Sequence, residues 1–362
     1  RWADAISFVI SPTIELPSET RLPRPSPDGL SLGFIQNLGD IMIRDLATGE
    51  DRMIRSGWDS GVEFQWSPDS AWMVFSQSDL DFNQDVFLVP VDASADPVNI
   101  TRHPDNDGNA RFSGDGRILA FSSERNDEEY DAYMVFLDRK LEKLAEPELE
   151  AYFEAQAKAA KARKPLDPDE VRKEIEARRT GDDEVAEVEG EPAADATEDD
   201  DAGAEDVATE DDETTEADDD AEAEEPPFTA DDLETAYRRL RQITNLPGSS
   251  SSLELMPAGD TVLFNYSTGA PGASGLYSIG WNGRERKRLG DTTSMQGLNL
   301  KGTGLVAVSS GRAQVLSLPG GKATRYPVSQ KIRIDLETQS SEKFLEAAGI
   351  IGALFYHPEM KG

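Results

Sequence analysis

The chain has 362 residues, enough for one large domain or two of ordinary size. It carries 71 acidic against 36 basic side chains, and this net charge of −35 argues against nucleic acid or an anionic membrane as the main partner, because phosphate groups are bound by clustered cations. With no Cys and two His, the sequence excludes disulfides, thiolate nucleophiles, Cys-ligated zinc and multi-histidine metal sites. No apolar stretch reaches the roughly 18 residues of a membrane-spanning helix, so we expect no membrane insertion.

The first expected element is strand material within residues 5–16, where residues 6–10 are β-branched or aromatic apart from one serine. The sequence begins with Arg1 and not with Met. We therefore expect it to be part of a longer protein, and its start does not report on a targeting signal.

A turn-and-strand unit then occurs three times. Ser26-Pro27-Asp28-Gly29 precedes a strand-like run, and the same order returns after 41 and then 46 residues. Proline fixes φ at the first corner of a tight turn, aspartate hydrogen-bonds back to the backbone, and glycine accepts the positive φ that ends the turn. A period of about 40–50 residues is typical of the four-stranded blades of a β-propeller. The turns are at residues 26–29, 67–70 and 113–116, and their strand-like runs are at 30–35 and 40–44, 71–75 and 85–89, and 118–121 and 132–136.

The unit recurs twice more near the C-terminus with a weaker turn signature and an interval of 45 residues. The sequence therefore predicts an all-β protein, a propeller with about five visible blades and room for more upstream. Met256-Pro257-Ala258-Gly259-Asp260 precedes the runs 261–264 and 276–279, and Lys301-Gly302-Thr303-Gly304 precedes the runs 305–308 and 313–318.

An insertion separates the third unit from the fourth. Residues 138–163 are rich in helix-forming residues, and Asp167-Pro168-Asp169-Glu170 predicts the start of another helix through residues 171–179. Residues 181–225 hold 24 acids and no Lys or Arg, so the other 317 residues carry a net charge of −11, that is −35 offset by 24. Such a segment cannot bury enough apolar surface to offset chain entropy, and we expect disorder across residues 181–227. Docking to a basic partner and electrostatic repulsion at an opening are the alternatives for this segment.

The sequence does not compose a catalytic site. Gly-x-Ser-x-Gly, phosphate-loop and His-Glu-x-x-His motifs are absent, and we assign no catalytic, cofactor-binding or metal-binding residue. His103 is interpreted as a structural histidine bonding across neighbouring blades; the alternative is a general base with Asp105 or Asp107. Residues 105–109 place oxygen ligands at alternate positions, but Gly116 stands where a calcium loop needs its acid. Ser340-Ser341-Glu342-Lys343 matches the Ser-x-x-Lys motif, and we interpret Ser340 or Ser341 as the cap of the following helix. His357 has no expected partner.

Acidic residues gather near the loops of the first blades. We interpret them as solvated turn residues, and the alternative is an acidic entrance that favours cationic peptides. They are Asp79, Asp81, Asp85, Asp105, Asp107, Glu128, Glu129 and Asp131.

The repeats resemble the blades of TolB-like propellers and of the tricorn protease family. Two further segments resemble the tricorn family: residues 238–248 (Arg-Arg-Leu-Arg-Gln-Ile-Thr-Asn-Leu-Pro-Gly), and residues 331–335 followed by a helix and by Phe355-Tyr356-His357-Pro358-Glu359-Met360-Lys361-Gly362. In that family a Phe-Tyr-x-Pro-x-Met-x-Gly pattern begins the helical domain that leads into the peptidase module. The helix 341–354 departs from the family because it lacks the usual Trp and basic residues.

The resemblance implies that this chain is the substrate-gating or substrate-binding part of a serine peptidase. In the family a serine attacks the peptide carbonyl with a histidine as base. The family's catalytic residues and PDZ-like domain fall beyond Gly362, so no residue of this chain inherits a catalytic role. The implied partners are peptides or unfolded polypeptides, with homo-oligomeric assembly and a cytoplasmic location, the periplasm being the alternative. A stand-alone TolB-like binding propeller and the propeller of a prolyl-oligopeptidase-type hydrolase remain alternative functions.

The same reading divides the chain into four parts. These are N-terminal blades (1–137), a helical and then acidic insertion (138–227), C-terminal blades (228–330) and the start of a helical domain (331–362).

Deletion of residues 181–225 should leave the thermal unfolding temperature nearly unchanged, because a segment of this composition contributes little packing. The measurement is thermal unfolding followed by circular dichroism for the full chain and the deletion variant. A drop of many degrees would show that the acidic segment packs against the fold.

Overall fold

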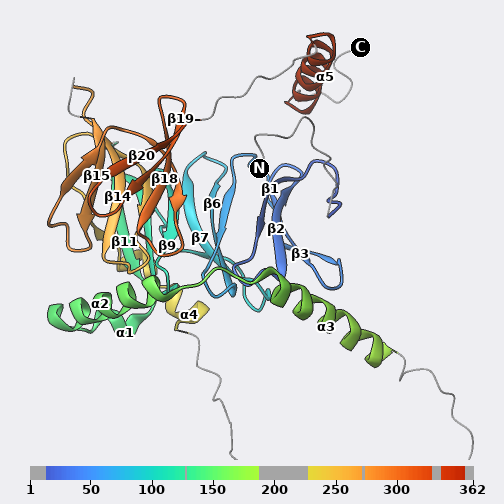
Figure 1. Cartoon of the computed structure of the whole chain (residues 1–362), viewed down its shortest axis with the longest axis horizontal. Coiled ribbons are helices and arrows are strands. Elements are labelled where there is room, and N and C mark those ends of the chain that lie inside the picture. The colour runs from blue at the N-terminus through green and yellow to red at the C-terminus, as the bar shows by residue number, and fades with distance from the viewer. Residues whose placement is uncertain (1–13, 127–128, 187–226, 271–273, 328–335, 355–362) are drawn as a thin grey trace, which may run out of the picture.

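The chain folds into a β-propeller of five four-stranded antiparallel blades, as the repeats predicted (Figure 1). The computed structural model describes residues 14–126, 129–186, 227–270, 274–327 and 336–354, so most of the strand material expected at residues 5–16 lies outside the described residues. Within each blade the strands are paired in chain order. Blade 1 comprises β1 (Arg21–Pro25), β2 (Ser31–Gln36), β3 (Asp40–Asp45) and β4 (Asp51–Arg55); blade 2 comprises β5 (Glu63–Trp66), β6 (Trp72–Ser78), β7 (Gln84–Pro90) and β8 (Val98–Asn99); blade 3 comprises β9 (Asp107–Phe112), β10 (Ile118–Asn126), β11 (Glu129–Phe136) and β12 (Arg241–Gln242); blade 4 comprises β13 (Ser249–Leu255), β14 (Thr261–Ser267), β15 (Gly275–Gly280) and β16 (Lys287–Gly290); and blade 5 comprises β17 (Ser294–Leu298), β18 (Gly304–Ser309), β19 (Arg312–Ser317) and β20 (Lys322–Tyr326).

The repeated turn joins the first and second strands of each blade. Its own side chains close it in blades 1, 2, 3 and 5, and backbone hydrogen bonds such as Gly259 N–H to the Met256 carbonyl close it in blade 4. In blade 2 the buried Ser67 hydroxyl donates to Asp69 and accepts from the Trp72 N–H at 2.8 Å. Asp69 in turn accepts from the Ala71 N–H at 3.0 Å. Each blade therefore begins with a locally determined corner that sets the angle between its two innermost strands. Ser26 with Asp28 and Ser113 with Asp115 repeat these bonds in blades 1 and 3, and Asn299 replaces the serine in blade 5, where it accepts from the Thr303 and Gly304 N–H groups.

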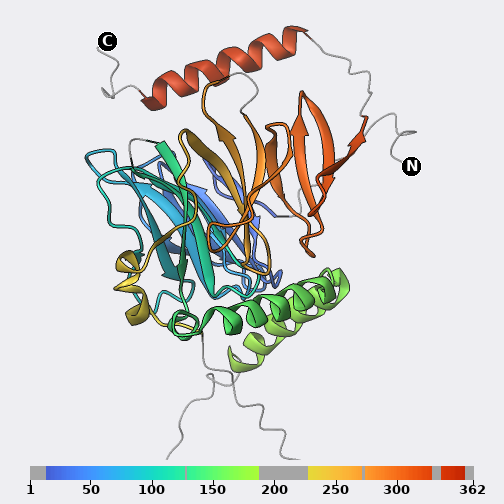
Figure 2. The ribbon, with the colours of Figure 1, turned by 90° about the vertical axis from the view of Figure 1, so that its left-hand side faces the viewer.

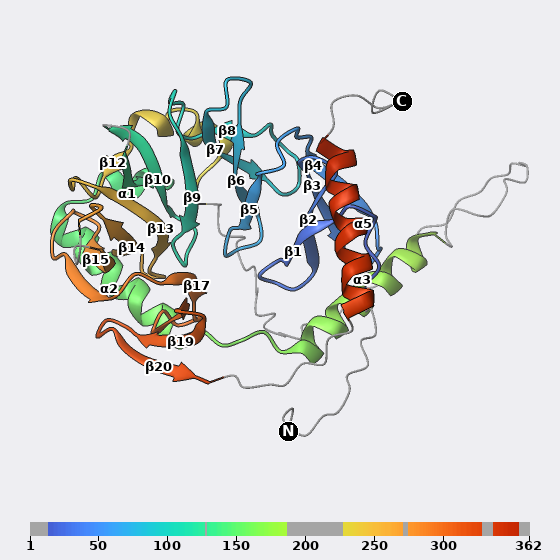
Figure 3. The same ribbon diagram turned by 90° about the horizontal axis from the view of Figure 1, so that it is seen from above.

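The hydrophobic core consists of apolar layers between neighbouring blades. Four clusters join blades 1 and 2, 2 and 3, 3 and 4, and 4 and 5. No such cluster joins blade 5 to blade 1 in the part of the chain that the structure describes, and Val306 and Val308 on β18 are 42% and 37% exposed. The five blades thus form an open arc, with blades 1 and 5 as its ends (Figure 3).

The insertion interrupts blade 3 between its third and fourth strands. After β11 the chain forms α1 (Arg139–Glu142), α2 (Glu146–Ala162) and α3 (Pro168–Ala186). It returns through α4 (Ala230–Leu233) and a 3-10 turn before β12 pairs with β11. The spacing of the repeats placed the insertion after the third unit as a whole, because the two-residue strand β12 is too short to be recognised in the sequence. The helix begins at Pro168, as the capping pattern predicted, and continues past residue 179 to Ala186. Residues 181–186 are therefore helical, which corrects the disorder expected there, and residues 187–226 lie outside the described residues.

The insertion helices cover one end of the propeller from blade 4 to blade 1 (Figure 2). Beneath blades 3 and 4, the Tyr152 hydroxyl of α2 donates to Asp115, and Phe153 packs on Trp281 with ring centroids 5.5 Å apart. At blade 1, Arg179 Nε of α3 donates to the Ala47 carbonyl at 3.0 Å. Between the two helices, Arg163 donates to the Gly114 carbonyl. The helical part of the insertion is therefore packed onto the fold.

The last described element is α5 (Leu336–Leu354), which lies beyond the opposite end of the propeller from α2 and α3 (Figure 2). Three of its large apolar side chains, Leu336, Phe344 and Leu345, are exposed, at 71%, 73% and 68%. Among the described residues, no helix is both long enough and apolar enough to cross a membrane.

Gly114 occupies the turn position that is proline in blades 1, 2 and 4. The substitution Gly114→Pro should lower the free energy of unfolding by about 1–3 kcal/mol. The substitution removes the hydrogen bond from the Gly114 N–H to the Pro257 carbonyl (2.8 Å) and places the ring against the Arg163 guanidinium. Urea unfolding measures the effect.

Pro68→Gly, at the same turn position of blade 2, is the matched control. It should cost less than about 1 kcal/mol, because its effect lies chiefly in the unfolded chain. Equal losses from the two substitutions would contradict the role of Gly114 in docking the insertion.

Candidate functional site

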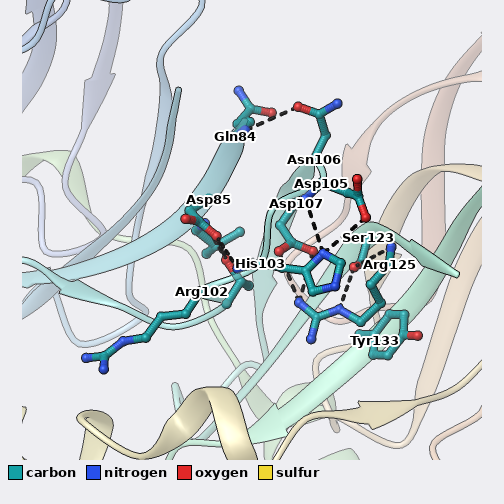
Figure 4. Close-up of polar contacts among 12 residues, drawn as sticks. Gln84, Asp85, Arg102, His103, Asp105, Asn106, Asp107, Ser123, Arg125 and Tyr133 are labelled. Atoms are coloured by element: carbon teal, nitrogen blue, oxygen red, sulfur yellow. Dashed lines mark hydrogen bonds and ion pairs between the residues drawn. The ribbon is translucent and has the colours of Figure 1, made fainter. Parts of the chain in front are cut away.

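His103 lies in the loop that joins blades 2 and 3 (Figure 4). Its backbone N–H donates to Asp85 Oδ1 at 3.2 Å. Its Nδ1 accepts from the Asp105 N–H at 3.2 Å and lies 3.4 Å from Asp105 Oδ2. The partners of His103 belong to blade 2 and to its own loop, which corrects the expected bond across neighbouring blades.

Asp107 is fully buried at the start of β9 and pairs with Arg125 of β10 (Figure 4). Arg125 Nη2 lies 3.0 and 3.3 Å from the two carboxylate oxygens, and the guanidinium packs over the Tyr133 ring at 5.0 Å. Burial raises the pKa of Asp107, while Arg125 and Ser123 act in the opposite direction. Removing either partner would leave a buried charge unpaired, so this pair fixes one end of blade 3.

Arg125 also separates the groups that a catalytic triad would join. Its Nε donates to Ser123 Oγ at 2.8 Å, and the Ser123 side chain is fully buried. The serine and Asp107 therefore both face the guanidinium, and no hydrogen bond joins either of their side chains to His103 in the described structure. This geometry gives no support to His103 as a general base with Asp107, whereas Asp105, the other partner considered, lies 3.4 Å from His103 Nδ1.

The loop considered for calcium directs its side chains to protein partners. Asn106 Oδ1 accepts from the Gln84 N–H at 3.2 Å, and Asn106 Nδ2 donates to Glu124 at 2.7 Å. Within the described ranges, no group of three or more His, Asp or Glu side chains is placed to hold a metal ion.

Two aspartates tie the outer strands to blades 2 and 3 in the same way. In blade 2, Asp85 accepts from the Thr101 hydroxyl at 2.7 Å, and Thr101 Oγ1 accepts from the Val86 N–H at 3.0 Å. In blade 3, Asp131 accepts from the Thr244 hydroxyl at 2.7 Å, and Thr244 Oγ1 accepts from the Ala132 N–H at 2.8 Å. An amide side chain, Asn99 or Gln242, donates to the second oxygen of each aspartate.

These bonds correct the expectation for three of the acidic residues of the first blades, whereas Asp79, Asp81 and Asp105 are exposed in loops, as the solvated-turn interpretation predicted. Asp85, Asp107 and Asp131 are bonded within the fold and are neither solvated turn residues nor an acidic entrance. Asp79 accepts from the Asp81 and Asn83 N–H groups and shapes the β6–β7 hairpin loop. Glu129 accepts from the Gly248 N–H at 2.6 Å, Asp81 and Asp105 are exposed, and Glu128 lies outside the described residues.

Ser340 does not cap a helix, which corrects the preferred interpretation of the Ser-x-x-Lys match. Ser340 and Ser341 both lie within α5, and the Ser340 hydroxyl donates to the Leu336 carbonyl at 2.6 Å. The Ser340 hydroxyl thus bonds back by one turn within the helix and not to an N-terminal N–H group. His357 lies outside the described residues.

The remaining candidate is the central channel, a cavity lined by the first strands of blades 2 to 5 and by the first turn of blade 1. Polar side chains connect these strands: Arg111 of β9 lies 3.2 Å from Glu254 of β13, and Gln65 of β5 accepts from Arg111 Nε at 3.3 Å when its amide is oriented to satisfy both groups. On the other side of blade 2, the Trp66 indole N–H donates to the Arg24 carbonyl of β1 at 3.0 Å. The channel wall thus continues across blades 1 to 4.

Three of these inner strands carry a bulge at a left-handed residue. Leu22 of β1, Asn109 of β9 and Ser252 of β13 have φ values of 51°, 54° and 52°, and each lies where the strand pairing shifts register. Bulges redirect side chains and leave backbone groups unpaired, and they recur beside binding sites. The sequence did not predict these bulges, because none of the three residues is glycine, the residue most often found at positive φ.

The channel has a mouth that faces the insertion. The second residues of the five repeated turns lie around this mouth. Residues 163–166, between α2 and α3, complete the lining of this cavity of about 540 Å³. A polypeptide segment of several residues can occupy such a space. The five turn residues are Pro27, Pro68, Gly114, Pro257 and Leu300.

No protein-family model matches this sequence, and no curated protein matches it. Among solved structures, tricorn protease is similar, with a TM-score of 0.57 and 13% identity over 94% of this chain and 29% of the tricorn chain. TolB from Acinetobacter baumannii has a TM-score of 0.48 and 12% identity, over 86% of this chain and 55% of TolB. A structure from an analysis of two prolyl endopeptidases has a TM-score of 0.42 and 12% identity, over 85% of this chain and 34% of that chain. The similarity establishes the propeller fold, and this chain spans under a third of the tricorn chain.

The Asp131 network generates a pH-dependent prediction. Burial raises the pKa of Asp131, so the folded state binds its proton more tightly than the unfolded state, in which the carboxyl ionises near pH 4. As pH rises from about 4 through the raised pKa, the wild type should lose stability relative to Asp131→Asn, which does not ionise there. Urea unfolding of both proteins between pH 4 and 7 measures this difference.

Asp81→Asn, in an exposed turn, controls for the change in net charge. The prediction would be contradicted if, as pH rises, the free energy of unfolding of the wild type increases relative to that of Asp131→Asn.

Proposed function

We propose that this chain is the non-catalytic propeller portion of a tricorn-like serine peptidase, and that it binds or gates peptide substrates for a catalytic core that follows it. The observation that carries this proposal is a channel-bearing propeller in a chain whose residues 355–362 resemble the start of the tricorn helical domain. The structural similarity to tricorn protease over 94% of the chain agrees with it.

The described residues support a binding role and not a chemical one. Ser123 and Asp107 are both hydrogen-bonded to Arg125, and His103 Nδ1 accepts from the Asp105 N–H. The channel offers what an extended peptide requires, namely backbone groups at bulged strands, polar side chains and apolar proline surfaces. Binding energy gained here would position a substrate for a reaction elsewhere in the protein.

The proposal includes the division of the chain inferred from the sequence. Residues 1–137 and 228–330 form the propeller, residues 138–227 the insertion, and residues 331–362 the start of a helical domain. The assembly is proposed to be a cytoplasmic homo-oligomer, as the resemblance implies.

The intact mass of the native gene product, with peptide mapping past Gly362, tests the proposal. We expect a much heavier protein whose downstream part is labelled by a fluorophosphonate serine-hydrolase probe and cleaves fluorogenic peptides. The isolated 362-residue chain should fold as mostly β structure, take up no probe and cleave nothing. A native protein that ends near Gly362, or probe labelling of the isolated chain, would overturn the proposal.

A further inference from the structure

The channel mouth beside the insertion gathers positive charge in an otherwise acidic chain. Three cationic side chains and one carboxylate line its cavity of about 540 Å³. The cations come from two sources, since Arg111 belongs to the inner strand of blade 3, whereas Arg163 and Lys164 belong to the insertion. The carboxylate is Glu254 of β13.

Only one of the three cations is neutralised within the cavity. Arg111 Nε lies 3.2 Å from Glu254 Oε1, and both side chains are largely buried. Arg163 donates to the Gly114 carbonyl, and this carbonyl carries no net charge. The guanidinium keeps further N–H donors that are not used in this bond. Lys164 is exposed and makes no ion pair in the part of the chain that the structure describes. The mouth therefore carries about two uncompensated positive charges.

The walls between these charges are apolar. Pro27, Pro68 and Pro257 project from three blades, and Leu300, which is 45% exposed, projects from a fourth. Such walls suit the aliphatic parts of amino-acid side chains and the faces of peptide groups better than the fully hydrated shell of a small inorganic anion. A nucleic acid is disfavoured because its closely spaced phosphates need more clustered cations than the two unpaired ones at this mouth.

We propose that this mouth, formed by Arg111, Arg163 and Lys164, binds the carboxylate side chains of an acidic, extended polypeptide segment. This inference rests on the proposed function in one respect, that polypeptides are what the channel receives. It reverses the sign of the substrate preference considered from the sequence, because the acids suspected of forming a cationic-peptide entrance are bonded within blades 2 and 3. The insertion then contributes directly to substrate choice.

The test measures peptide binding by the whole chain at 0.15 M salt, where charges more than about 8 Å apart are largely screened. The probe is a C-terminally amidated decapeptide of alternating Glu and Gly carrying a dye of zero net charge, read by fluorescence anisotropy. A peptide with Lys in place of Glu reverses the charge, and an uncharged Ser-Gly peptide with a free C-terminus tests the terminal carboxylate. We expect the Glu peptide to bind and the other two to bind at least about tenfold more weakly.

The matched variants are Lys164→Glu at the mouth and Lys173→Glu on the exposed side of α3, which change the net charge equally. Lys164→Glu should weaken binding of the Glu peptide about tenfold, and Lys173→Glu should leave it within about twofold of wild type. Both lysines are exposed and make no ion pair within the described residues, so both variants should fold, which circular dichroism checks.

Three results would overturn the proposal. The first is tighter binding of the Lys peptide than of the Glu peptide, which the net charge alone predicts. The others are equal weakening of Glu-peptide binding by the two variants, and binding of the Ser-Gly peptide with a free C-terminus as tightly as the Glu peptide. Because the binding experiment uses no peptidase, its failure would leave the mass and peptide-mapping test of the proposed function intact. A native protein ending near Gly362 would likewise leave a positive binding result standing.

Discussion

The structure depends on the need of each four-stranded sheet to bury its faces against a neighbour. A single blade is too small to enclose a core, so the apolar side chains of adjacent blades must interdigitate, as Phe64, Phe75 and Ile41 do between blades 1 and 2. At about 25 cal/mol per Å² of apolar surface, these layers supply most of the stabilisation. The arrangement is radial because every blade has a twist of the same hand and packs face to face on the next. The central channel is a consequence of this packing and needs no further explanation.

The insertion is part of that packing and not an appendage to it. Phe153 and Leu149 of α2 are 4% and 3% exposed and belong to the same apolar cluster as blades 3 and 4. At the other end, α3 contacts blade 1, where Val171 lies against Gly29. The helices therefore connect blades that are far apart in the arc. Residues 163–166, which connect the two helices, line the channel mouth.

Much of the fold could be predicted from the sequence because its signals are local. The Ser26-Pro27-Asp28-Gly29 turn needs only its own side chains and the next strand, so the sequence pattern and the hydrogen bonds agree. The site could not be predicted in the same way. Asp85 meets Thr101 across 16 residues and Asp131 meets Thr244 across 113, and these partners are joined by strand pairing that the sequence does not state. The register shifts at Asn109 and Ser252 are likewise set by neighbouring strands.

The distribution of charge shows why net charge is a poor guide to the preference of this channel. The acidic stretch dominates the total, but the potential inside a cavity is set by groups within a few ångströms and by the low dielectric of its walls. At the mouth those groups are Arg111, Glu254, Arg163 and Lys164. Aspartates that the sequence places beside the first blades are bonded to Thr101, Arg125 and Thr244, so they act as structural acceptors. A strongly acidic chain can therefore present a locally cationic site, and the helical insertion supplies two of its three cations.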